Sequence, residues 1–157
     1  MHKYGDKLAQ IERFVKDDED WKKIWLRAKI HSSSDEIASV WQEHLLIERD
    51  CNEPDKMDVI PAGNCVHFFT VKNLETVEGK FSYEVGLKCF NLESEKFEDT
   101  KTPVRVELKD RLRGIKAILP HKAQVDLGQL YVLFGMYDSY SVRKLLNDDG
   151  QLMIATD

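Results

Sequence analysis

The stretch Cys65-Val66-His67-Phe68-Phe69-Thr70-Val71 marks the change in hydrophobic pattern on which the fold prediction depends. It is apolar on both alternating faces, which is typical of a strand in the interior of a sheet. Residues 130–136 repeat this pattern, whereas residues 81–89 and 104–109 alternate apolar with polar side chains and predict strands with one face in water. Short connections favour antiparallel pairing. We therefore expect 65–71 and 130–136 to be interior strands of one mostly antiparallel sheet.

The first fifty residues show helical spacing instead. Trp21, Ile24, Trp25 and Ala28 repeat as i, i+3, i+4 and i+7, the pattern of an amphipathic helix. Four acidic residues at 17–20 precede this segment, where they would cap the helix and favour its dipole. Two further helices are expected from the stripes Tyr4, Leu8, Ile11, Val15 and Ile37, Val40, Trp41, His44, Leu45, the second preceded by a capping-box pair, Ser33 and Glu36.

These patterns predict a single α+β domain over residues 1–157, with a helical part at 1–50 and an antiparallel sheet part at 57–157. Three N-terminal helices would pack on a mostly antiparallel five- to seven-stranded sheet. Residues 141–146 are read as one helical turn near the C-terminus. The order of elements resembles that of cystatin-like and NTF2-type folds, which implies a small-molecule pocket protein or enzyme of NTF2-like architecture as one alternative function. A fold by itself does not determine function.

The composition is that of an ordinary globular chain, with 42% hydrophobic and 32% charged residues. No stretch approaches the ~18 apolar residues of a membrane span, and no apolar segment follows the N-terminus. We expect a soluble, cytoplasmic protein that does not contact membranes. Three cysteines, at 51, 65 and 89, form no CxxC pair, so we expect reduced thiols and neither a metal nor a cofactor.

One pair of side chains could carry chemistry. Cys65 and His67 are two residues apart on an expected strand and therefore share a face. A thiol beside an imidazole can be a nucleophile or supply two metal ligands, and Cys89 would join them if 65–71 and 81–89 form a hairpin. Because Phe69 and Val71 share that face, we favour plain core packing. No catalytic motif occurs, so we assign no catalytic residue and lean against an enzyme.

Residues 101–122 form the one positive segment, with seven Lys or Arg against two Asp or Glu in a chain of net charge −5. Such a row of cations can hold the phosphates of a nucleic acid or another anion. Alternatively it could pair with the acidic helices or remain a solvated face. No aromatic side chains are interleaved with these cations along the sequence. Val104, Val106, Leu108 and Leu112 would face the core. The candidate binding residues are Arg105, Lys109, Arg111, Arg113 and Lys116.

Our leading hypothesis is a non-enzymatic interaction protein that acts through a protein partner or as a homodimer. It depends on the absence of catalytic motifs and on a stock of aromatic residues that exceeds the needs of one small core. Nucleic-acid or anion binding through 101–122 is the second hypothesis, and a small-molecule pocket is the third. The aromatic residues concerned are Trp21, Trp25, Trp41, Phe68, Phe69 and Phe134.

Overall fold

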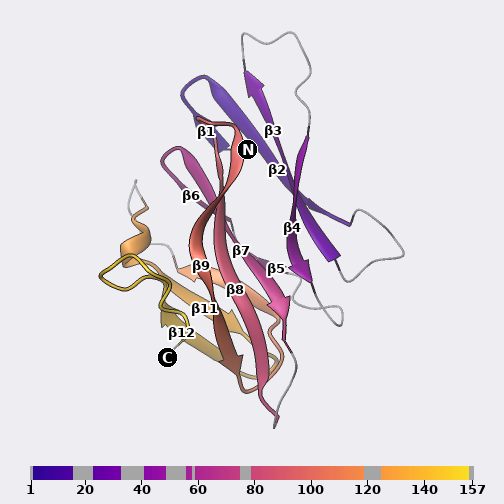
Figure 1. The fold of residues 1–157 in the computed structure, drawn as a ribbon, viewed down its shortest axis with the longest axis vertical. Coiled ribbons are helices and arrows are strands. Elements are labelled where there is room, and N and C mark those ends of the chain that lie inside the picture. Colours follow the sequence, from indigo (N-terminus) through magenta and orange to yellow (C-terminus); the bar gives the residue numbers. More distant parts are fainter. Residues whose placement is uncertain are drawn as a thin grey trace.

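The computed structural model describes residues 2–15, 23–32, 41–48, 56–57, 59–74, 79–118 and 125–155. These residues are almost entirely strand (Figure 1). The elements are β1 (His2–Tyr4), β2 (Lys7–Phe14), β3 (Lys23–Ser32), β4 (Gln42–Glu48), β5 (Lys56–Met57), β6 (Val59–Ala62), β7 (Cys65–Asn73), β8 (Phe81–Asn91), β9 (Lys96–Leu108), β10 (Gly114–Ile118), the 3-10 turn η2 (Leu127–Gln129), β11 (Tyr131–Gly135) and β12 (Tyr140–Lys144).

The strands form two sheets. The larger has the order β1-β2-β3-β4-β7-β8-β9, and the smaller has the order β12-β11-β10-β5. Pairing is antiparallel except for two short parallel contacts, β4 with β7 and β5 with β10. One edge of β7 is shared, because β6 pairs with its first half and β4 with its second. The antiparallel strands expected from the sequence are present, but β7 and β11 belong to different sheets rather than to one.

The three predicted N-terminal helices are wrong, and with them the α+β class and the resemblance to cystatin-like and NTF2-type folds. No α-helix occurs among the described residues. In β3, Leu26, Ala28 and Ile30 are buried and alternate with Arg27 and Lys29, which is the period of a strand. Ile24 and Ala28 are four residues apart and therefore fitted a helical pattern equally well. Burial against β2, where Ala9 lies opposite Ile30 and Ile11 opposite Ala28, decides for the strand.

Other N-terminal expectations can be placed only in part. The acidic run at 17–20 and the Ser33–Glu36 pair lie outside the described residues, as does Trp21. The expected helical turn at 141–146 is also wrong, because this segment largely forms β12. No helix of the described chain is long and apolar enough to cross a bilayer.

The first half of strand β7 is covered on both faces, whereas Lys72 near its end is exposed. On one face, Phe69 and Val71 pack in a core that also contains Val132 and Phe134 of the smaller sheet. On the other, Val66 packs in a second core with Ala9, Ala28 and Ile30. The Phe97 ring stands edge-on to Phe68 and Phe90, with centroid distances of 5.8 and 5.0 Å. Strands β7 and β8 thus form a central layer between the smaller sheet and the β2–β3 hairpin.

A buried arginine ties the smaller sheet to its surroundings. Arg143 of β12 donates to the backbone oxygens of Ile154 at 2.8 Å and Glu107 at 3.2 Å. Its guanidinium also lies over the Phe134 ring, 5.5 Å from the centroid. These bonds fix the inner face of the smaller sheet against β9 and the C-terminal segment, so its opposite face points outward.

Candidate functional site

The basic residues singled out in the sequence do not share one face. The expected alternation holds, because Val106, Leu108 and Leu112 are buried whereas the five cations are exposed. Arg105 lies on the outer face of the larger sheet. Lys116 lies on the outer face of the smaller sheet, because the chain passes from one sheet to the other between β9 and β10.

Several of these cations have neighbours on their own surface. Arg105 donates to the Ser82 hydroxyl at 3.2 Å and lies 3.4 Å from a Glu107 carboxylate oxygen. The Arg111 guanidinium lies 5.8 Å from the Phe81 ring centroid. Within the described part of the segment, residues 101–118, the cations are therefore divided among different surroundings and do not form a continuous strip.

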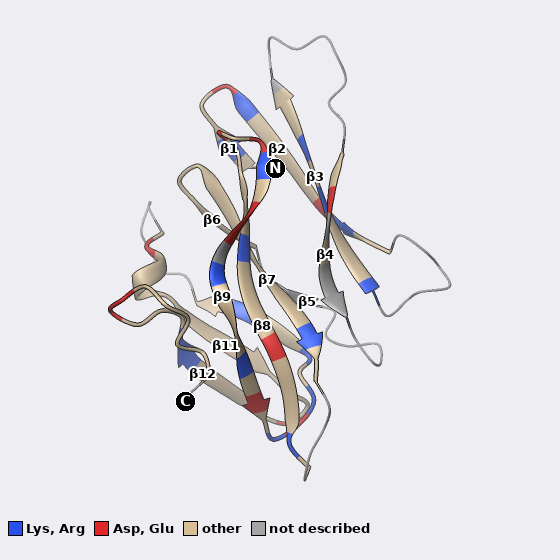
Figure 2. Cartoon of the chain, viewed as in Figure 1, with Lys and Arg blue, Asp and Glu red and all other residues tan. Residues whose placement is uncertain are grey.

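Basic and acidic residues are interspersed along β7, β8 and β9 of the larger sheet (Figure 2). Lys72, Glu84 and Arg105 lie opposite one another on three adjacent strands. Lys88 forms an ion pair of 3.2 Å with Asp99. Because opposite charges face each other across the strands, this surface is largely neutralised from within.

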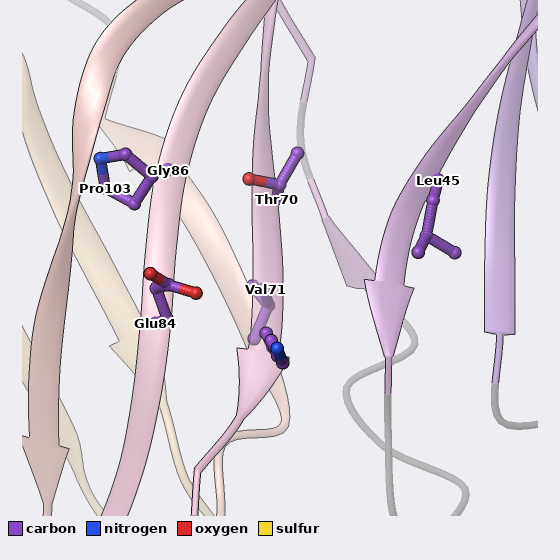
Figure 3. A pocket seen from close by; sticks show the side chains of 7 residues that line it. Leu45, Thr70, Val71, Glu84, Gly86 and Pro103 are labelled. Carbon is purple, nitrogen blue, oxygen red and sulfur yellow. The ribbon is translucent and has the colours of Figure 1, made fainter.

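A hollow of about 140 Å³ opens on this face, with Leu45 of β4 across from Thr70 of β7 (Figure 3). Gly86 forms part of its wall, where an added Cβ would lie 2.8 Å from the Thr70 hydroxyl and 3.3 Å from Pro103. The β8–β9 register shifts at this point, between Val85 and Leu87. The close packing around this register shift accounts for the glycine at position 86. The charges at the rim of the hollow, Lys72 and Glu84, lie opposite each other. Its lining residues are Leu45, Thr70, Val71, Lys72, Glu84, Gly86 and Pro103.

Cys65, His67 and Cys89 are brought together as the hairpin expectation required. His67 lies directly opposite Cys89 in the β7–β8 ladder, and both cysteines are free thiols. Burial, followed by the charge of and a hydrogen bond with Cys89, raises the pKa of the Cys65 thiol to about 12. Burial and then the Lys101 charge lower the pKa of His67. A protonated thiol beside a neutral imidazole is a poor nucleophile at neutral pH.

The same cluster offers no metal centre. Within the described ranges, no group of three or more His, Cys, Asp or Glu is arranged to hold a metal ion. Cys51 lies outside those ranges. His67 and Cys89 are buried next to the core around β7, and Cys65 is half-buried.

The outer face of the smaller sheet differs from all these surfaces. We define the β10–β12 face as the side chains that point away from the core on three adjacent strands. The pairing register places them in two full rows across β10, β11 and β12. One row is Lys116, Leu133 and Val142, and the other is Ile118, Tyr131 and Lys144. A third row has Gly114 and Gly135 beside Tyr140. The face consists of Lys116, Ile118, Tyr131, Leu133, Tyr140, Val142 and Lys144.

The β10–β12 face is largely apolar, and most of its side chains are exposed among the described residues. Tyr131 is 48% exposed and Tyr140 69%, whereas Val132 and Phe134, which point inward from the same sheet, are fully buried. Ile118 and Val142 are exposed as well, at 45% and 41%. Isolated exposed apolar residues are normal, whereas a contiguous set such as this one is a candidate interaction surface.

The charges of this face are all positive. None of its side chains is a carboxylate, and within the described chain no ion pair is found for Lys116 or Lys144. At the end of the face, the Arg113 backbone N–H donates to the Gly135 oxygen at 2.7 Å. The Arg113 guanidinium lies 4.7 Å from the Tyr137 ring centroid. The surface therefore combines tyrosines and aliphatic side chains with two lysines, Lys116 and Lys144, for which the described residues provide no ion pair.

Only Arg113 and Lys116 of the five sequence candidates lie at this surface. Tyr131, Tyr140, Val142 and Lys144 were missed, because they come from segments that carry no charge excess. The one feature of the sequence that pointed to this surface was the apolar pattern of 130–136 on both of its faces. That pattern does not reveal which of the two faces would be left uncovered.

No protein-family model, no curated protein and no solved structure matches this chain, so the functional argument depends on the surface itself.

Proposed function

We propose that this chain is a non-enzymatic interaction protein that binds a protein partner through its β10–β12 face. The observation that carries the proposal is the exposure of Tyr131, Ile118 and Val142 as one contiguous set on the outside of a sheet. Tyrosines on a rigid surface contribute large contact areas at low conformational cost and are enriched among binding hot spots. Strand positions also hold these side chains in fixed register.

Two observations favour binding over catalysis. The Cys65 thiol, which could have been a nucleophile, has a pKa raised to about 12 by burial and by Cys89. The charges around the hollow at Gly86 are matched across strands by opposite charges. Free Cys65 and Cys89 fit a cytoplasmic location, which forms part of this proposal.

The test compares immobilised full-length protein with two double variants. Tyr131→Ser/Val142→Ser removes an aromatic and an aliphatic side chain from the β10–β12 face. Tyr4→Ser/Leu8→Ser is the matched control, because Tyr4 and Leu8 are similarly exposed, at 39% and 38%, on β1 and β2. We expect a cellular protein retained by the wild type and the control to be lost by the first variant. The purified partner should then bind the wild type in calorimetry.

Equal retention by all three proteins would overturn the proposal. Sedimentation velocity on the purified wild type tests whether the chain forms a homodimer. A dimer abolished by Tyr131→Ser/Val142→Ser would replace the separate partner with a second copy of the chain.

Nucleic-acid binding is a second candidate, supported by one observation. Tertiary structure places Tyr131 opposite Lys144 and Tyr137 over Arg113, pairs that are distant in sequence. Aromatic rings among cations are the elements of a platform for single strands. Fluorescence anisotropy with a labelled oligo-dT and oligo-U at low and moderate salt tests this. Tight, salt-sensitive binding lost in Lys116→Glu/Lys144→Glu would support it, and loss only in Arg105→Glu/Lys109→Glu would favour the end of β9 and the residue that follows it instead.

A further inference from the structure

We infer that the β10–β12 face recognises a short acidic segment of its partner, with an aromatic or aliphatic residue between two carboxylates. This inference rests on the proposed function and specifies the chemistry of the partner. It follows from the size of the face and from the position of its two lysines.

The face is small for a globular partner. Three strands spaced about 4.8 Å apart and three rows about 6.8 Å apart give an area of roughly 300 Å². A standard interface buries about 800 Å² on each partner. The face therefore suits a single segment, and its length matches about six residues in extended conformation.

The cations flank an apolar centre. Lys116 and Lys144 are two strands and one row apart, which corresponds to roughly 12 Å between their Cα atoms. Tyr131 and Leu133 of β11 lie between them. Since the face has no carboxylate of its own, a segment that supplies one at each side would neutralise both lysines while its apolar residue covers β11. Four residues of an extended chain span a similar distance.

The experiment is a selection of random twelve-residue peptides displayed on phage against the immobilised full-length protein. We expect enriched peptides to carry Asp or Glu on both sides of an aromatic or aliphatic residue. A synthetic peptide of that sequence should bind Lys116→Glu/Lys144→Glu about tenfold more weakly or worse, because like charges would face each other. A separate selection on that variant should enrich Lys and Arg instead. The matched control is Lys3→Glu/Lys96→Glu, which changes net charge equally at two exposed lysines elsewhere and should behave as the wild type.

The outcomes separate the inference from the proposed function. Neutral or basic peptides that bind the wild type but not Tyr131→Ser/Val142→Ser would overturn the acidic segment and leave protein binding through this face intact. Peptides that bind that variant as well as the wild type would overturn both. Oligonucleotide binding at the face without any selected peptide would also overturn the inference, in favour of a nucleic-acid ligand.

Discussion

Strands β7 and β11 have the same sequence pattern but different surroundings. Both are apolar at odd and even positions, and both lie between two neighbouring strands. In β7, Val66 and Phe68 are buried on one face and Phe69 and Val71 on the other. In β11, Val132 and Phe134 are buried, whereas Tyr131 is 48% exposed. The first half of β7 is therefore covered on both faces, whereas β11 is covered on one.

The missing layer over β11 is what makes a surface there. The β2–β3 hairpin packs on the face of β7–β8 that the smaller sheet leaves open. Among the described residues, none buries the outer face of β11 in the same way. An apolar face that would normally be covered remains available, and the cations on the adjacent strands add polarity to it. Truncating the covered side chains and measuring the free energy of unfolding tests this difference most directly.

The largest effects should come from β7 and from the inner face of β11. Truncating Phe68, Phe69 or Phe134 to Ala should lower the free energy of unfolding by about 3–5 kcal/mol each, because each leaves a cavity in a close-packed core. Urea denaturation with a shared m-value measures the change. A cost below about 1 kcal/mol for either Phe68→Ala or Phe69→Ala would show that one face of β7 is not buried.

An intermediate effect should appear as pH dependence at His67. Its pKa is lowered by burial and then by the Lys101 charge, so the folded state keeps the ring neutral while the unfolded chain takes up a proton near pH 6.5. This group's contribution to stability is therefore present above that pH and lost as the pH falls below it. His67→Leu should remove the dependence, so the wild type should lose stability relative to this variant between pH 7.5 and 5.0. Parallel stability curves would contradict the burial of His67.

The smallest effect on stability should come from the outer face of β11. Tyr131→Ser should change the free energy of unfolding by no more than about 0.5 kcal/mol, as is usual for an exposed position. The matched measurement is Tyr4→Ser, and both variants should unfold at nearly the wild-type urea concentration. If Tyr131→Ser costs as much as Phe134→Ala, the face is covered and the comparison with β7 fails.

The sequence predicted the strands at 65–71, 81–89, 104–109 and 130–136 correctly, but it predicted a helical turn where β12 lies and helices where the described N-terminal residues form β1 to β4. The two-residue period of 81–89 and 104–109 is unambiguous, because polar and apolar side chains alternate without exception over several positions. In residues 23–32, Ile24, Leu26, Ala28 and Ile30 follow the same two-residue period. Ile24, Trp25 and Ala28 also fit a helical stripe, so this segment is consistent with either structure. Local spacing left both structures open there.

The candidate site was predicted only at its margin. Arg113 and Lys116 were selected by charge, and their outward orientation follows from alternation with Leu112 and Ile115. The tyrosines that complete the surface lie on β11 and β12 and become their neighbours through antiparallel pairing across the sheet. Such pairing depends on contacts distant in sequence, so no local pattern contains it.

The sequence by itself predicted that residues 65–71, 81–89, 104–109 and 130–136 are strands whose side chains alternate between two faces, because side-chain period is a local property of the backbone. Only the tertiary structure decided that β7 and β11 lie in different sheets and that one of the two is covered on a single face. Coverage depends on where a whole layer packs, and the free energy of that packing comes from residues far apart in the chain. The exposure of Tyr131 beside Lys116 and Lys144 is therefore a property of the assembled fold.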